Sequence, residues 1–354
     1  MKAKRIVFIT SLLVLFGICF TVMNRHYDEL ARYPYVTSEN RDIILEHLSN
    51  DDINYMISQQ LKPEQFLPYI ETEGFVLRNT LWYNRAKEVR SASNETIIAF
   101  INDFKNHLDY AGLETLLKAY SYDTLRTFYE EENDYIQNAD IVNDPASLLT
   151  LIDDEETLYT YQPKKLVSVK DVPHVSLVDG KSDIKVLSEV KKPLQKLCSD
   201  ISKVNNKTCG NLILTAGYIS YEDQVPIYES MMLKYGRDDF RRFWDYPGQS
   251  EYQLGTLIRF QPVGRESSSV DDELLQPQDN DTKDDKEESE DSKLAEWLAD
   301  NAYKYGFIIR YPKDKEDVTK KLYQPFTLRY VGKEVAEILH QNHQALNEYH
   351  VEIK

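Results

Sequence analysis

The sequence is short of positive charge. Its 354 residues carry 42 lysines and arginines against 59 aspartates and glutamates, a formal net charge of −17. Nucleic-acid backbones and anionic lipid surfaces repel such a chain, so neither is expected as a main partner. Hydrophobic residues make up 42% of the chain, which is enough to build real cores. The length suits two domains, or one large domain with appendages.

Long apolar runs are also scarce, and the clearest one lies at the N-terminus. A basic stub at residues 1–5 precedes an uncharged, mostly apolar run at Ile6–Met23. As a helix this run would be roughly 27 Å long, close to the ~30 Å hydrocarbon core of a bilayer. It lacks a small-x-small cleavage site near its end. We therefore predict an uncleaved signal anchor over residues 1–23, a single pass through the cell membrane and an extracellular C-terminal part. A cleaved signal peptide is the alternative.

Cysteine is rare, with three residues in all. Cys19 falls within the predicted anchor, and Cys198 and Cys209 fall outside it, eleven residues apart. An oxidising compartment permits a disulfide between the second and third. Because spacing alone does not fix geometry, a bonded pair and two free thiols both stay open.

The region from residue 24 to 156 reads as a helical spacer domain. Apolar residues recur at helical spacing over 43–57 and 97–117, and Ser93 is a helix start signal. No residue pattern in this region carries catalytic chemistry. We interpret it as a structural spacer, with a binding module as the alternative.

From about residue 157 to the end at 354, the pattern changes to short strands mixed with helices. Strands are predicted at 166–170, 211–217, 255–261, 307–311 and 326–331. Helices are predicted at 183–204, 221–235, 294–305 and 332–347. Such a mixture predicts the α+β class.

An acidic segment at 265–293 interrupts this second domain. It is rich in Asp, Glu and Ser and has almost no apolar residues. It cannot bury enough surface to offset the entropy of ordering the chain, so we predict a disordered insertion. It also lacks the spacing and the glycine turn of a calcium-binding loop.

Four ordered segments give the domain a family resemblance. They read AGYISYEDQ at 216–224, YPGQSEYQLG at 246–255, NAYKYGFIIRYP at 301–312 and YQPFTLRYVG at 323–332. Together they resemble segments of the VanY-like zinc D-alanyl-D-alanine carboxypeptidases of bacteria. The resemblance covers roughly 167–339. It implies a Hedgehog/DD-peptidase type domain, in which helices flank a small antiparallel sheet, and a peptidoglycan substrate.

The catalytic residues that the resemblance implies are missing. The family's three zinc ligands would fall at Tyr252, Arg259 and Thr327, and its general base at Gln324. Arg259 is a fixed cation with donors only, Thr327 is a poor neutral ligand, and Gln324 has no proton affinity near neutral pH. Tyr252 would have to ionise from a reference pKa near ~10. The family's arginine for the substrate carboxylate is replaced by Ile219. We predict that the chain holds no zinc and no other cofactor.

Two further residue patterns could indicate an active site of another kind. His340 and His343 are three residues apart on the last predicted helix, where they could share a face, but an exposed polar helix face is the much better explanation. Ser182 and Ser188 each begin an S-x-x-K pattern of serine-type peptidases. The companion S-D-N and K-T-G elements of that class are absent. Neither pattern is expected to form a site.

We therefore expect a pseudoenzyme of the cell wall that binds a peptidoglycan stem peptide or an envelope protein. An active but atypical carboxypeptidase and a purely structural membrane partner are the alternatives. The candidates for ligand binding are Arg259, Ser250, Gln324, Tyr252, Tyr218 and Gln224.

Arg259 offers two mutually exclusive roles. If it pairs with an internal carboxylate (Glu251, Glu222 or Asp223), the cleft is a structural core. If it faces solvent, it can bind the carboxylate of a ligand.

Overall fold

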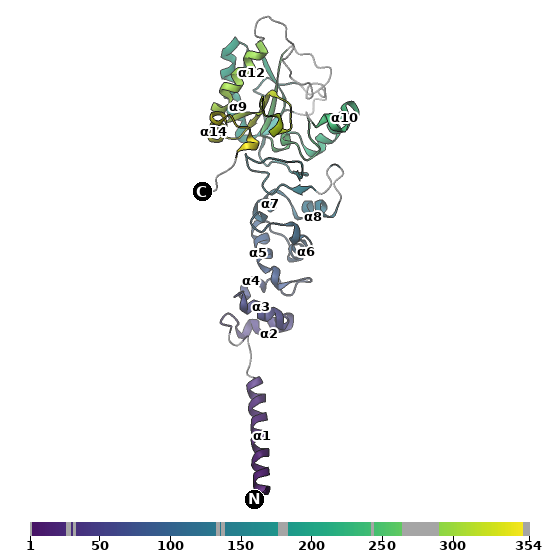
Figure 1. Cartoon of the computed structure of the whole chain (residues 1–354), viewed down its shortest axis with the longest axis vertical. Coiled ribbons are helices and arrows are strands. Elements are labelled where there is room, and N and C mark those ends of the chain that lie inside the picture. The colour runs from purple at the N-terminus through teal and green to yellow at the C-terminus, as the bar shows by residue number, and fades with distance from the viewer. Residues whose placement is uncertain are drawn as a thin grey trace. The chain divides into compact units, whose positions relative to one another are not determined.

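A computed structural model of the chain describes residues 2–25, 30, 33–131, 135, 139–175, 183–241, 244–263 and 290–349 (Figure 1). The chain splits into two compact units, Met1–Glu114 and Thr115–Lys354. Each unit has its own hydrophobic core.

The first unit is built from short helices. These are α2 (Ser38–His47), α3 (Asn50–Ser58), α4 (Pro63–Phe66), η2 (Leu77–Asn79), α5 (Thr80–Val89), α6 (Asn94–Phe104) and η3 (Lys105–His107). Ser93 caps α6 as its sequence suggests, because its hydroxyl accepts the backbone N–H of Thr96 at 3.2 Å. One apolar cluster of this unit joins α2, α3 and α4 around Ile44, Met56 and Phe66, all fully buried.

The unit also contains α1 (Lys2–Arg25), which includes the apolar run expected to be helical. Side chains of this helix are described for 8–20, where the large apolar ones are exposed. Within the residues that the structure describes, no helix has both the length and the hydrophobicity needed to cross a membrane. The anchor expected over residues 1–23 is not supported by this finding and stays a prediction.

The second unit is organised by one antiparallel sheet of four strands. The strands are β5 (Leu212–Ala216), β6 (Leu257–Pro262), β7 (Phe307–Tyr311) and β8 (Gln324–Tyr330), in the order β5-β6-β8-β7. All pairings are antiparallel, and both central strands are buried along almost their whole length. A small antiparallel sheet flanked by helices is what the family resemblance predicts.

The helices of this unit are α7 (Leu113–Ala119), α8 (Tyr122–Glu130), α9 (Ser188–Asn205), η4 (Thr208–Asn211), α10 (Tyr221–Phe240), η5 (Glu251–Leu254), α12 (Glu290–Asn301), η6 (Ala302–Tyr305), α13 (Glu316–Thr319), α14 (Lys333–Asn342) and η7 (Leu346–Glu348). Of these, α9, α12 and α14 lie beside the sheet (Figure 1). The main core lies between α9 and α12 and the sheet, where Leu194, Leu298, Phe260 and Leu328 are fully buried. The apolar faces of α9 and α12 thus serve packing against the sheet.

Two small sheets complete the unit. β1 (Asp140–Ile141) pairs in parallel with β2 (Glu156–Thr157), and β3 (Leu166–Ser168) pairs antiparallel with β4 (Lys185–Leu187). β4 lies inside the range predicted as helix from 183. It is a strand because buried Val186 pairs with Val167 of β3, and α9 begins only at Ser188.

The unit boundary lies earlier than the predicted position 157. Residues 115–156 belong to the second unit. Buried side chains of the sheet domain hold the backbone at the end of this stretch. Arg329 of β8 donates to the carbonyls of Leu148 and Thr150, at 3.2 and 3.1 Å. Gln249 donates to three carbonyls between 153 and 156.

The predicted acidic insertion lies mostly outside the described residues, at 264–289. Its last residues do not fit the prediction, since Glu290 to Lys293 form the first turn of α12. Lys207 holds this turn through an ion pair with Glu290 at 2.7 Å.

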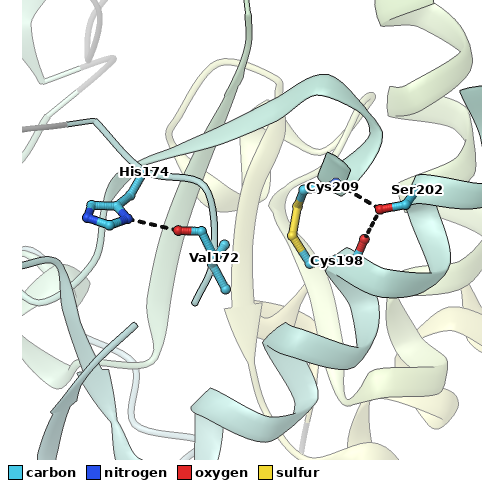
Figure 2. Close-up of a disulfide and its surroundings, with 5 residues drawn as sticks. All are labelled: Val172, His174, Cys198, Ser202 and Cys209. Carbon is cyan, nitrogen blue, oxygen red and sulfur yellow. Dashed lines mark hydrogen bonds between the residues drawn. A yellow bond between two sulfur atoms is a disulfide. The ribbon is translucent and has the colours of Figure 1, made fainter. Parts of the chain in front are cut away.

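Cys198 of α9 and Cys209 of η4 are joined by a disulfide (Figure 2). Between them the chain turns through residues with positive φ, including Asn206 and Cys209. Ser202 spans the same turn: its hydroxyl donates to the carbonyl of Cys198 at 2.7 Å and accepts the N–H of Cys209 at 2.8 Å. The bond therefore closes the connection from α9 into β5.

Reducing this disulfide should destabilise the second unit. The chain-entropy account of a loop of this length gives a loss of about 3 kcal/mol in the free energy of unfolding. Urea unfolding with and without a phosphine reductant measures it. A Cys198→Ala/Cys209→Ala double variant is the control, and it should be insensitive to the reductant. Equal stability of the oxidised and reduced wild-type chain would contradict the prediction.

Candidate functional site

The four positions where the family resemblance puts zinc ligands and base come together in the fold. Tyr252 lies on η5, Arg259 on β6, and Gln324 and Thr327 on β8. The register of the sheet sets Arg259 directly opposite Thr327, with Ala216 of β5 on its other side. The motifs thus bring the four positions together in the fold, and their role as a site stays a prediction.

All four side chains are buried, with 1–8% of their surface exposed. The hydroxyl of Thr327 donates to Oε1 of Gln324 at 2.9 Å. The ring of Tyr252 stacks on Trp244, with centroids 5.4 Å apart and planes at 18°. These contacts fill the site with side chains of the protein itself.

The chemistry of these residues does not fit a zinc ion. Burial raises the pKa of the Tyr252 hydroxyl to about 12, although Arg259 and the Thr327 side chain oppose this rise. A neutral phenol and a cationic guanidinium are unsuitable ligands, and the guanidinium would repel the metal. Among the residues that the structure describes, no three His, Cys, Asp or Glu side chains are placed to hold a metal ion.

Arg259 is 3% exposed, so the alternative in which it faces solvent is wrong for this structure. Arg259 also takes part in at least one polar or electrostatic interaction within the protein. Of the carboxylates suggested as its partners, Glu251 is instead taken up by Arg310 and Arg329. Asp223 accepts a hydrogen bond from the hydroxyl of Ser220 at 2.8 Å, and Glu222 is exposed. Arg259 is thus part of a polar core.

The remaining ligand candidates divide into buried and accessible residues. Ser250 is 1% exposed, and Gln224 is fully buried. The amide of Gln224 donates to Oε1 of Gln253 at 2.9 Å and accepts the N–H of Gly248 at 2.9 Å, which is a structural role. Tyr218 is half-buried, and burial followed by Glu222 and Asp223 raises its pKa to about 12.

The alternative histidine pair does not resemble a metal site. The ring of His340 stacks on Tyr303, with centroids 4.0 Å apart and planes at 13°. His343 ends α14 in the left-handed region, with φ of 52°. Of the two serines that begin an S-x-x-K pattern, Ser182 lies outside the described residues and Ser188 is the first residue of α9.

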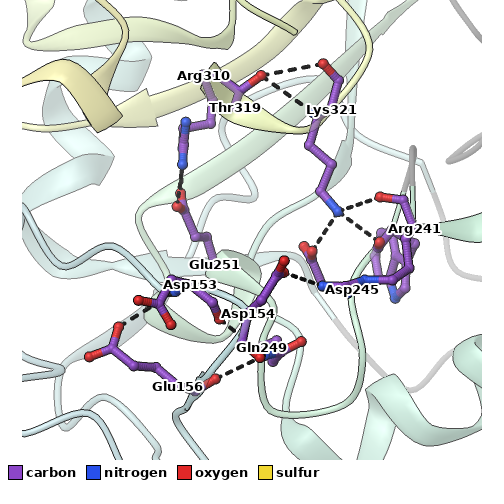
Figure 3. Close-up of polar contacts among 11 residues, drawn as sticks. Asp153, Asp154, Glu156, Arg241, Asp245, Gln249, Glu251, Arg310, Thr319 and Lys321 are labelled. Atoms are coloured by element: carbon purple, nitrogen blue, oxygen red, sulfur yellow. Dashed lines mark hydrogen bonds and ion pairs between the residues drawn. The ribbon is translucent and has the colours of Figure 1, made fainter. Parts of the chain in front are cut away.

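A buried charge cluster of Glu251, Arg310 and Arg329 is the feature that sequence reasoning missed, and Figure 3 shows the contact between Glu251 and Arg310. Both carboxylate oxygens of Glu251 accept from Arg310, at 2.7 and 2.8 Å, and one also accepts from Arg329 at 2.8 Å. The three side chains are at most 5% exposed. Burial alone would raise the pKa of Glu251, but the two arginines together hold it below its ordinary value. All three residues stand in the quoted motifs, so charged residues within the motifs were the available signal.

Replacing Glu251 with Gln should destabilise the second unit by about 3–5 kcal/mol, because two buried arginines lose their counter-charge. Urea unfolding of the full-length chain measures this loss. Glu296→Gln removes the same charge from the exposed face of α12 and should change stability by less than about 0.5 kcal/mol. Similar losses of stability in the two variants would show that buried Glu251 stabilises the unit no more than an exposed glutamate does.

Comparisons with known proteins agree with this fold. Residues 183–333 match the sequence model of the VanY family, D-alanyl-D-alanine carboxypeptidase. YodJ of Bacillus subtilis (strain 168), a candidate carboxypeptidase, is 31% identical over 233 residues, which are 65% of this chain and 77% of YodJ. The bifunctional D-Ala-D-Ala dipeptidase and carboxypeptidase VanXYC of Enterococcus gallinarum is 28% identical over 184 residues, 51% of this chain and 86% of VanXYC.

Two solved structures are also similar. The LD-carboxypeptidase LdcB has 29% identity and a TM-score of 0.48, over 63% of this chain and 94% of LdcB. VanYB, solved with D-alanine-D-alanine, has 24% identity and a TM-score of 0.40, over 58% and 98%. The family assignment rests on the sequence comparisons, above all on the extent of the match to YodJ. By that match, the chain belongs to the VanY D-alanyl-D-alanine carboxypeptidase family.

Proposed function

We propose that this chain is a non-hydrolytic member of the VanY family that binds peptidoglycan stem peptides at the cell envelope. Family membership supports a peptidoglycan-related role of the peptidase type. The non-hydrolytic part rests on one observation. The four positions of the family's ligands and base hold a buried Tyr, Arg, Gln and Thr, and two of these are hydrogen-bonded to each other.

The chemistry of hydrolysis explains why this observation matters. Attack on a peptide carbonyl in this family needs a metal-bound water and a carboxylate that takes its proton. Gln324 cannot accept that proton, and its Oε1 is occupied by the Thr327 hydroxyl. Tyr252 stays protonated at neutral pH because burial raises its pKa to about 12.

Two alternatives remain open to experiment. An atypical but active carboxypeptidase agrees equally well with family membership, and it would need ligands from elsewhere. A purely structural partner of another envelope protein is favoured by the filled site, since Arg259 and Tyr252 are too buried to meet a ligand directly. Binding and turnover must therefore be measured together.

The full-length chain should co-sediment with insoluble peptidoglycan, release no D-alanine from stem peptides and carry no stoichiometric zinc. Sedimentation, a D-alanine assay and elemental analysis measure these outcomes. Zinc-dependent release of D-alanine, together with about one bound zinc per chain, would establish the active alternative. Absence of sedimentation would favour the structural partner.

A variant with the family's residue types tests whether the fold of this chain can still form a zinc site. Tyr252→His, Arg259→Asp, Gln324→Glu and Thr327→His together rebuild the residue types of the family. Because the register already sets position 259 opposite 327, the folded variant should bind zinc where the parent does not. A folded variant that fails to bind zinc would show that more than these four positions has changed.

We also propose that the chain is held at the outer face of the cell membrane. Two observations support this location: the exposed apolar side chains of α1 between positions 8 and 20, and the disulfide, which an oxidising compartment favours.

The full-length chain should stay with membranes during carbonate extraction at high pH, because extraction removes proteins that are held by charge alone. A variant that begins at residue 26 should be released into the supernatant. Immunoblots of the two fractions measure the distribution. Release of the full-length chain would exclude the anchor.

A further inference from the structure

A groove of about 480 Å³ opens in the second unit beside β7, and none of the four motif positions lines it. Its volume lies within the usual range of ligand pockets, about 300–1,000 Å³. Residues of α12 and η6, of β7 and of α14 line it, together with the turn that follows β7. The buried part of the lining is apolar, and its members are at most 8% exposed: Leu298, Ala302, Phe307, Ile308 and Leu339.

The strand that lines this groove is an edge strand. The sheet order β5-β6-β8-β7 leaves β5 and β7 at the two edges. At the β5 edge the chain covers itself, because Leu214 donates to the carbonyl of Pro173 at 2.8 Å and Val175 donates to that of Leu214 at 3.0 Å. Within the described part of the chain, no such backbone bond reaches the outer edge of β7. Unmet N–H and C=O groups at an edge attract another extended chain.

Ile309 is the residue of this edge that lies in reach of a ligand. Tyr330 of β8 donates its N–H to the carbonyl of Thr256, on the side of β6, so it makes no ladder bond to its neighbour Phe307. Bonding alternates along an antiparallel pair, so Phe307 and Ile309 both direct N–H and C=O away from β8. Phe307 is fully buried, whereas Ile309 is partly exposed and lines the groove. The groove thus presents one backbone donor and one acceptor for an amide.

The rim of the groove carries more cations than anions. Its ionisable residues are Lys313, Asp314, Lys315, His340 and His343. Lys315 is held by Glu348 at 2.8 Å, and the ring of His340 stacks on Tyr303. Lys313 is exposed and forms no ion pair with any residue in the described ranges. In a chain of net charge −17, such a rim is a local site for an anionic group.

A short peptide with a free carboxylate fits all three features. Its amide groups match Ile309, its carboxylate matches Lys313, and small side chains fit the apolar lining. Lys313 follows Ile309 by four residues, which is at most about 14 Å of chain. A dipeptide spans about 7 Å, and the lysine side chain covers the remaining distance. An inorganic anion would use the cation alone, and a lipid would leave the backbone groups of Ile309 unmet.

We propose that this groove binds the free carboxyl end of a stem peptide, with its carboxylate on Lys313 and its backbone on Ile309. The proposal rests on the proposed function and names the part of the stem peptide that is recognised. It also gives the chain a binding site that does not use the filled motif positions.

Calorimetry on the full-length chain tests the proposal with matched probes. Diacetyl-Lys-D-Ala-D-Ala carries the carboxylate, and its carboxamide differs only in lacking that charge. The acid should bind about tenfold more tightly, as expected for a charge-assisted hydrogen bond. An equal Kd for the two peptides would overturn the proposal.

A third probe tests the backbone contact. A methyl group on the amide nitrogen between the two alanines removes the N–H nearest the carboxylate. Because this N–H is the donor available to the carbonyl of Ile309, the methylated acid should bind about tenfold more weakly than the parent acid. Unchanged affinity would overturn the pairing with β7.

Variants tie the binding to this groove. Lys313→Gln should weaken the acid and leave the carboxamide unaffected, whereas Asp314→Asn should tighten the acid, since asparagine tolerates the φ of 63° at this position. Ala299→Trp adds a large side chain from the exposed face of α12 and should abolish binding of both peptides. Lys192→Gln, on the exposed face of α9, is the control and should leave Kd unchanged. Unaltered urea midpoints verify folding, and an unchanged Kd in Lys313→Gln or Ala299→Trp would refute the assignment.

The two proposals fail in different ways. If the chain sediments with peptidoglycan but its affinity ignores the carboxylate and the groove variants, the proposed function stands and the groove is wrong. If it neither sediments nor binds any of the peptides, both are wrong.

Discussion

The second unit depends on one buried carboxylate. Glu251 is bound by Arg310 of β7 and Arg329 of β8, and Arg329 also bonds to the backbone at 148 and 150. Such a cluster adds little net stability over a well-packed apolar one, but removing a single member is costly. Its effect is therefore to specify how η5, two strands and a distant loop fit together. Tyr252 follows Glu251 on the same turn, so the cluster also fixes the first of the four positions that the family resemblance assigns to zinc ligands and base.

The same short segment organises the loop around it. Gln249, Glu251 and Gln253 alternate along the chain, and each bonds to a different stretch. Gln249 holds the carbonyls at 153–156, and Gln253 donates to those of Tyr159 and Tyr161 at 2.6 and 2.9 Å. Because buried amides must find partners, this segment commits the preceding loop to the sheet domain. This loop and Gln249 also help to line a cavity of about 690 Å³ in the second unit.

The sequence predicted the four strands of the main sheet and most of the longer helices, because motif order and periodicity depend on short-range patterns. It placed the domain boundary too late, since the bonds from Arg329 to the loop at 148–150 join residues about 180 positions apart. It also read β4 as helix, because Val186 becomes a strand residue only through its pairing with Val167. The roles of Arg259 and Glu251 could not be assigned for the same reason. Which carboxylate meets which arginine is decided by sheet register.

The four residues at the positions that the family resemblance assigns to zinc ligands and base agree with one another chemically. The resemblance implies one carboxylate as ligand and one as base beside a metal ion of charge +2. In this chain both carboxylate positions carry residues without negative charge, Arg259 and Gln324, and Tyr252 stays neutral because burial raises its pKa to about 12. A carboxylate left alone at position 259 would be buried without a counter-ion, and a metal left without its carboxylates would be held weakly. Single changes on the path between the two states are therefore unfavourable. The four positions are therefore expected to depart from the family pattern together, and the residues present here agree with that expectation.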